Sequence, residues 1–126
     1  MKQEDKQLLF KDLCARLPYH DLQVRYDNKD WFVIGYGHER IELLPNPFSS
    51  ITSPCPLIED VKLYLRPMSS MTEEEENEYN SLNAYEKGIF PHTEEAFDWL
   101  NAHHFDYRRL IEKGLALEAP EGMHKF

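Results

Sequence analysis

The stretch "LYLRPMSSMTEEEENEYN", residues 63–80, changes its pattern in the middle. Its first residues continue an alternation of apolar and polar side chains that predicts a strand over 61–66. Pro67 then ends the strand, because proline has no backbone N–H to donate. Thr72 and Glu75 have the spacing of a helix capping box. The stretch therefore predicts a strand that passes directly into a helix.

This helix would begin with an unusually acidic turn, made of Glu73, Glu74, Glu75 and Glu76. The helix dipole favours negative charge at that end, so the charges suit the position. On the preceding strand, the alternation places Lys62, Tyr64 and Arg66 on a face turned to solvent.

Residues before this stretch predict a helix followed by a small sheet. Apolar residues recur at helical spacing over 4–17, and Pro18 ends the helix, whose polar side is expected to face solvent. Three segments rich in β-branched and aromatic residues then predict an antiparallel meander, "LQVRY" (22–26), "WFVIGY" (31–36) and "RIELL" (40–44). Because 31–36 is apolar on both faces, we expect it at the centre of the sheet.

After the acidic helix, a second helix is expected to begin at Thr93, and a short third one at Asp106 with Gly114 as its C-terminal cap. The tail is expected to dock in part, through Leu115 and Leu117. The predicted fold class is α+β, with an N-terminal helix, a small antiparallel sheet of three to four strands, and C-terminal helices packed on one face. The predicted organisation is one domain over 1–126, with helix 4–17, sheet 22–66, helical part 72–114 and partly ordered tail 115–126.

Length and composition support a folded, single-domain protein. The chain has 126 residues, of which 41% are hydrophobic and 29% charged, as in ordinary globular domains. No run approaches the roughly 18 apolar residues of a membrane span, so neither a membrane segment nor a secretion signal is expected. The two cysteines lack metal-binding spacing and are expected to be reduced thiols of a cytoplasmic protein.

The charge is uneven along the chain. Residues 1–66 hold nine Lys or Arg against ten Asp or Glu, whereas residues 67–126 hold five against thirteen. Nonspecific binding of nucleic acid relies on clusters of Lys and Arg. The sequence contains no such cluster, so direct nucleic-acid binding is not expected. The acidic half suits a basic protein partner.

No catalytic, cofactor-binding or metal-binding residue is predicted. His103 and His104 are adjacent, so on a helix they point about 100° apart and cannot both bind one metal ion from the same face. We expect them to act at a helix end, where they satisfy carbonyls or interact with the helix dipole. The sequence also lacks a GxSxG motif and a Gly-rich phosphate loop.

A mixed aromatic and cationic segment, "WLNAHHFDYRR" (99–109), has the composition of interface centres. The simpler interpretation is that its aromatic residues Trp99, Phe105 and Tyr107 form core. Strand residues could join the same patch if the helix packs beside the strand. The candidate interaction surface consists of Tyr64, Arg66, Glu73, Glu74, Glu75, Glu76, Trp99, His103, His104, Tyr107 and Arg108.

Three stretches carry a family resemblance: "FKDLCARLPYH" (10–20), "YLRPMSSMTEEE" (64–75) and "DWLNAHHFDYRRLIEKGLALEAPEGM" (98–123). They resemble small uncharacterised proteins of Bacteroidales prophages and mobile elements. The resemblance implies an accessory role in bacteria or phage and implies no catalytic or binding residue.

The predicted function is that of a non-enzymatic accessory protein that binds another protein. One alternative is a small-molecule or nucleotide-binding domain, in which the Pro-rich loop 45–56 closes over an aromatic pocket. Another is a structural homo-oligomer that buries the apolar strand. The sequence alone leaves the partner and the oligomeric state open.

Overall fold

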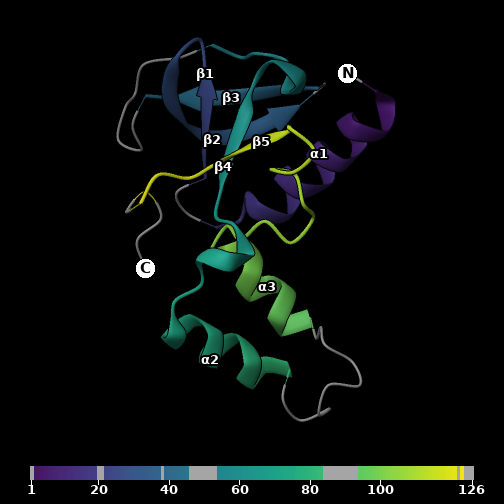
Figure 1. The fold of residues 1–126 in the computed structure, drawn as a ribbon. Coiled ribbons are helices and arrows are strands. Elements are labelled where there is room, and N and C mark those ends of the chain that lie inside the picture. The colour runs from purple at the N-terminus through teal and green to yellow at the C-terminus, as the bar shows by residue number, and fades with distance from the viewer. Residues whose placement is uncertain are drawn as a thin grey trace.

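The structure is a computed structural model that describes residues 2–19, 22–37, 39–45, 54–83, 94–121 and 123. A sheet and one helix form one end of the molecule, and two further helices form the other (Figure 1). The N-terminal helix, the sheet and the later helices confirm the α+β class. None of the described helices is long and apolar enough to cross a membrane.

Helix α1 (Gln3–Arg16) lies against the sheet and matches the predicted helix to within one residue at each end. Leu9 and Leu13 are buried in the main core, as their spacing predicts. The prediction that its polar side faces solvent is wrong at Asp12, which is fully buried. Arg16, one turn further along the helix, is fully buried as well.

These two buried side chains form an ion pair that connects α1 to the C-terminal part. Arg16 Nε lies 2.8 Å from Asp12 Oδ2, and Arg16 Nη2 donates to the carbonyl oxygen of Phe105 at 2.6 Å. Arg108 Nη1 also donates to Asp12, at 2.7 Å. Burying a charge costs several kcal/mol unless it is paired and hydrogen-bonded. Here the two charges are paired, although Nη1 of Arg16 has no hydrogen-bond partner. The network therefore fixes the 105–108 segment against α1.

The sheet has five strands in the order β3-β2-β1-β4-β5. Their bounds are β1 (Gln23–Tyr26), β2 (Lys29–Gly37), β3 (Arg40–Leu44), β4 (Lys62–Leu65) and β5 (Ala116–Glu118). The first three form the predicted antiparallel meander. Asp27 and Asn28 join β1 to β2 with φ of 52° and 60°. A two-residue type I′ hairpin turn requires this left-handed conformation at both positions.

Two predictions about the sheet are wrong. The sheet is mixed and has five strands instead of three to four antiparallel ones, because the tail adds β5 parallel to β4, with Ala116 opposite Leu63. The 31–36 segment is paired on both sides, with β1 and β3, but it is not covered on both faces as expected, because Ile34 is 52% and Tyr36 43% exposed. A register shift between Val33 and Gly35 interrupts the pairing at Ile34.

The helical part extends beyond one end of the sheet (Figure 1), so the expectation that the C-terminal helices pack on one face of the sheet is wrong. It consists of a short 3-10 turn, η2 (Met68–Ser70), and helices α2 (Glu73–Asn83) and α3 (Glu94–Ala102). These pack around a second core of Trp99, Leu100 and Phe105, which Met68, Met71, Tyr79, Leu82 and Tyr107 border. Contrary to prediction, η2 separates β4 from α2. The expected N-cap Thr93 lies outside the described residues.

The predicted short helix from Asp106 is a series of turns instead. The carboxylate of Asp106 accepts the backbone N–H groups of Leu110 and Ile111, at 2.8 and 2.9 Å, so it does cap the turn that it opens. Gly114 has φ of 75°, which glycine adopts at little cost, and β5 begins two residues later.

We predict that Asp12→Ala destabilises the fold by about 3–5 kcal/mol, because it leaves the buried guanidinium of Arg16 without its carboxylate. Urea unfolding measures the change. Glu4→Ala on the exposed side of α1 is the control and should change the free energy of unfolding by less than about 0.5 kcal/mol. Equal small losses in both variants would contradict the structural role given to this pair.

Candidate functional site at the groove around Arg66

The candidate site forms where two neighbouring strands of the sheet separate. Leu65, at the end of β4, accepts the N–H of Ala119 from the chain that follows β5. The next residue, Arg66, makes its backbone hydrogen bonds to a different segment of the chain. Its N–H donates to the carbonyl of His104, and its carbonyl accepts the N–H of Asp106. Pro67 has no N–H to continue the ladder toward Ala119, so the two chains separate there.

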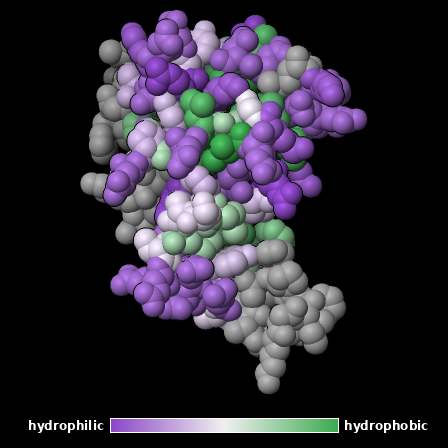
Figure 2. Space-filling view, in the orientation of Figure 1, coloured by the Kyte–Doolittle hydropathy of each residue, from purple (hydrophilic) through white to green (hydrophobic). Residues whose placement is uncertain are grey.

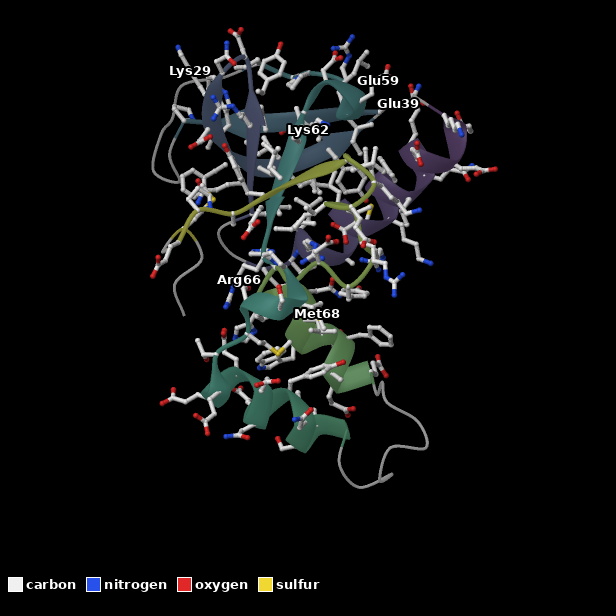
Figure 3. The ribbon with its side chains drawn as sticks, in the orientation of Figure 1. Lys29, Glu39, Glu59, Lys62, Arg66 and Met68 are labelled. Atoms are coloured by element: carbon white, nitrogen blue, oxygen red, sulfur yellow. The ribbon has the colours of Figure 1, made fainter. Side chains whose placement is uncertain are left out.

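Arg66 is held at this point by Glu75 of α2. Both terminal nitrogens of Arg66 bond to the two carboxylate oxygens of Glu75, each at 2.7 Å. The guanidinium also lies 4.2 Å from the centre of the Phe105 ring, a cation–π distance. Figure 3 shows Arg66 where the end of β4 meets the helical part. This residue therefore joins the sheet, α2 and the second core.

Glu75 also forms the predicted capping box with Thr72, and this prediction is confirmed. Its Oε1 accepts the N–H of Thr72 at 3.0 Å, and Thr72 Oγ1 accepts the N–H of Glu75 at 3.1 Å. The hydrogen bonds from Arg66, and to a smaller extent those from Thr72, lower the pKa of Glu75 from 4.5 to about 2 against the opposing effect of burial. Glu75 is thus ionised across the physiological range.

A groove of about 580 Å³ lies beside this pair. Its lining residues, which we call the Arg66 groove, are Arg66, Pro67, Ser70, Thr72, Glu74, Glu75, Glu118, Ala119, Pro120 and Glu121. Glu74, Glu118 and Glu121 are exposed, and none of the three forms an ion pair with another described residue. Since Glu75 occupies the guanidinium of Arg66, the groove carries an excess of negative charge.

The four consecutive glutamates have three different environments. Glu75 supports the fold, Glu74 lines the Arg66 groove, and Glu73 and Glu76 are exposed outside the groove lining. Figure 2 shows how hydrophilic residues cover the outer side of α2. The predicted acidic surface is therefore present, but its members are not equivalent.

Tyr64 lies apart from the groove, and its predicted position on a solvent-exposed face is wrong. It is only 5% exposed, and its hydroxyl donates to Asp30 Oδ1 at 2.6 Å and accepts from Arg25 at 3.2 Å. Burial and the bond to Asp30 raise the pKa of this phenol. Tyr64 thus binds β4 to the β1–β2 hairpin.

Trp99 belongs to the second core. Its position agrees with the interpretation of this residue as core and not with a role at the centre of an interface. Its ring stacks on His103 at 4.1 Å and on Phe105 at 5.6 Å between centroids, and it is 9% exposed. The Nδ1 of His103 lies 2.9 Å from the carbonyl oxygen of Trp99, the helix-end contact that was expected. His104 is fully buried, with φ of 57°.

Tyr107 and Arg108 lie on the side of the helical part that faces α1. Arg108 is 4.5 Å from the centre of the Tyr107 ring and bonds to Asp12, and the Tyr107 hydroxyl donates to Asn101 at 3.0 Å. Arg66 does join the 99–109 segment, through Phe105, as the sequence suggested. The predicted surface therefore separates into a groove part, a core part and an α1 part.

Sequence reasoning missed one wall of the groove, formed by Glu118, Ala119, Pro120 and Glu121. These residues lie in the tail, which was expected to be only partly ordered. Two carboxylates that flank a proline in "LEAPEG" were the available signal, since proline at a sheet edge restricts the chain. Recognising them required the position of β5.

No family model, curated protein or solved structure matches this chain. Among the described residues, no three His, Cys, Asp or Glu side chains are grouped to hold a metal ion. An excess of carboxylates beside hydroxyls and a fixed guanidinium can attract and orient cationic side chains.

We predict that Glu75→Gln lowers stability by about 1–2 kcal/mol at neutral pH, through loss of a charged hydrogen-bonded pair and a weakened cap. Because the folded-state pKa is depressed, the stabilisation by Glu75 is present above pH 4.5 and is lost as pH falls toward 2. The variant should therefore lose less stability than the wild type over that interval. Urea titrations at several pH values measure this, with exposed Glu76→Gln as the control. Parallel curves for wild type and Glu75→Gln would contradict the assignment.

Proposed function

We propose that the protein is a non-enzymatic accessory protein, of bacterial or prophage origin and acting in the cytoplasm, that binds a basic surface of another protein through the Arg66 groove. The observation that carries the proposal is the set of three exposed carboxylates without an ion-pair partner in the described chain, Glu74, Glu118 and Glu121, around one groove. Lys and Arg side chains of a partner would pair with them.

The wall residues come from two separate parts of the fold, which supports a preorganised site. Glu74 belongs to α2, whereas Glu118 is the last residue of β5 and Glu121 lies three residues beyond it. The Arg66–Glu75 pair joins these two parts, so the carboxylates are held in position before a partner arrives. Preorganisation lowers the entropic cost of binding, and the charge speeds encounter with a basic partner.

The alternative of an aromatic small-molecule pocket under the Pro-rich loop has less support. Residues 46–53 of that loop lie outside the described residues. The lining of the Arg66 groove contains no aromatic residue, and Trp99 is packed in the second core. We retain protein binding as the proposal.

The test compares two triple variants with the same charge change. Glu74→Lys/Glu118→Lys/Glu121→Lys reverses the groove, and Glu73→Lys/Glu76→Lys/Glu94→Lys reverses exposed positions outside its lining. Each tagged protein is used to capture partners from lysate of a bacterium that carries prophages or mobile elements. The affinity of a captured protein for the wild type and for each variant is then measured by direct titration. We expect the groove variant to weaken binding at least about tenfold, and added salt to weaken it in the wild type.

Retention of the partner by the control variant is required. If both variants lose it equally, net charge and not the groove governs binding. If the groove variant binds as tightly as wild type, the proposal is wrong. Circular dichroism of both variants verifies that they are folded.

A further inference from the structure

A second hollow, of about 420 Å³, lies at the far end of the molecule from the Arg66 groove. One wall is a single stripe of α1, at the three- and four-residue spacing of a helix face, and consists of Gln3, Lys6, Gln7, Phe10 and Lys11. The other wall is formed by Glu39, at the β2–β3 turn, and Ile58 of the 3-10 turn η1 (Ile58–Asp60). Figure 3 labels Glu39 and Glu59 beside the N-terminal half of α1, well away from Arg66.

The floor of this hollow is apolar, and an exposed aromatic ring extends it. Ile58 is buried and Phe10 half-buried. The ring of Tyr36 packs edge-on against Phe10, at 5.0 Å between centroids, and yet Tyr36 remains 43% exposed. Large apolar side chains with this exposure beside a hollow are characteristic of interfaces.

The charges at the rim are balanced and lie on opposite walls. Lys6 pairs with Glu59 at 3.4 Å. That leaves Lys11 on the α1 wall and Glu39 on the turn, both exposed and neither ion-paired within the described chain. The face therefore presents one cation and one anion across an apolar floor.

We propose that a second copy of this chain docks on this face, so that Lys11 of each copy meets Glu39 of the other and the floor around Phe10 and Tyr36 is covered. A twofold interface must be complementary to itself, and a rim with one free charge of each sign on opposite walls meets that condition.

The distribution of charge supports a second copy as the occupant. Residues 67–126 hold five Lys or Arg against thirteen Asp or Glu, so approach of two copies through the helical part brings like charges together. Residues 1–66 are nearly neutral, with nine against ten, and the hollow lies within them. Docking through this face would keep the two Arg66 grooves apart and accessible. The inference does not depend on the proposed function of the groove.

The test is a charge swap followed by sedimentation velocity over a wide range of protein concentration. We expect wild type to form a dimer in a concentration-dependent manner. Lys11→Glu or Glu39→Lys alone should weaken the dimer about tenfold, since each change places like charges together twice in a twofold interface. The double variant Lys11→Glu/Glu39→Lys should restore dimerisation, because the pairs re-form with their signs exchanged.

Glu73→Lys is the matched control for net charge. It changes the charge of the protein by the same amount as Glu39→Lys but lies on α2. If general repulsion governs association, both changes strengthen the dimer, whereas the proposed contact requires Glu39→Lys to weaken it. A wild type that stays monomeric at all concentrations overturns the proposal. So does a dimer that is insensitive to the single changes, or one that the double variant fails to restore.

Discussion

The buried pair of Asp12 and Arg16 is the constraint on which the arrangement of the two cores depends. The pair lies on α1, a helix that packs on the sheet, yet Arg16 donates to the carbonyl of Phe105, a residue of the second core. Arg16 is fully buried and its Nη1 has no hydrogen-bond partner, so the guanidinium depends on the bonds that its Nε and Nη2 do make. If the loop that supplies the carbonyl moved away, a further buried donor would lose its partner. One ion pair thereby sets the distance between the sheet and the helical part.

Phe105 transmits that constraint to the groove. Its carbonyl is held by Arg16, while the segment beside it pairs with Arg66, through the N–H of Arg66 to His104 and the N–H of Asp106 to Arg66. The ring of Phe105 then supports the guanidinium that Glu75 holds. The order of dependence runs from α1 to the 104–106 segment, to Arg66 and to the start of α2. The groove therefore depends on contacts between residues that are distant in sequence, such as Arg66 with His104 and Asp106. These contacts hold its two walls in place although the walls are far apart in the chain.

How much of this the sequence predicts follows from the range of each signal. The capping box, the β1–β2 turn, α1 and the left-handed Gly114 are local, because neighbouring residues alone specify them. The strand β5 is not local: three residues carry too little periodicity to be recognised, and Ala116 becomes a strand residue only by pairing with Leu63. Asp12 and Arg16 look like solvent-exposed residues for the same reason, since their partners at 105 and 108 are some ninety positions away. Tyr64 alternates with core residues, and only the β1–β2 hairpin shows why its hydroxyl is buried.

The two surfaces considered for binding differ in a way that follows from this architecture. The Arg66 groove lies where the acidic half of the chain meets the end of the sheet, and its only cation in the lining is already paired with Glu75. The α1 hollow lies in the nearly neutral half and combines apolar floor with opposite charges. A surface with excess charge of one sign selects a partner of the other sign, while a balanced apolar surface can pair with itself. Separation of the two along the molecule means that occupation of one leaves the other open.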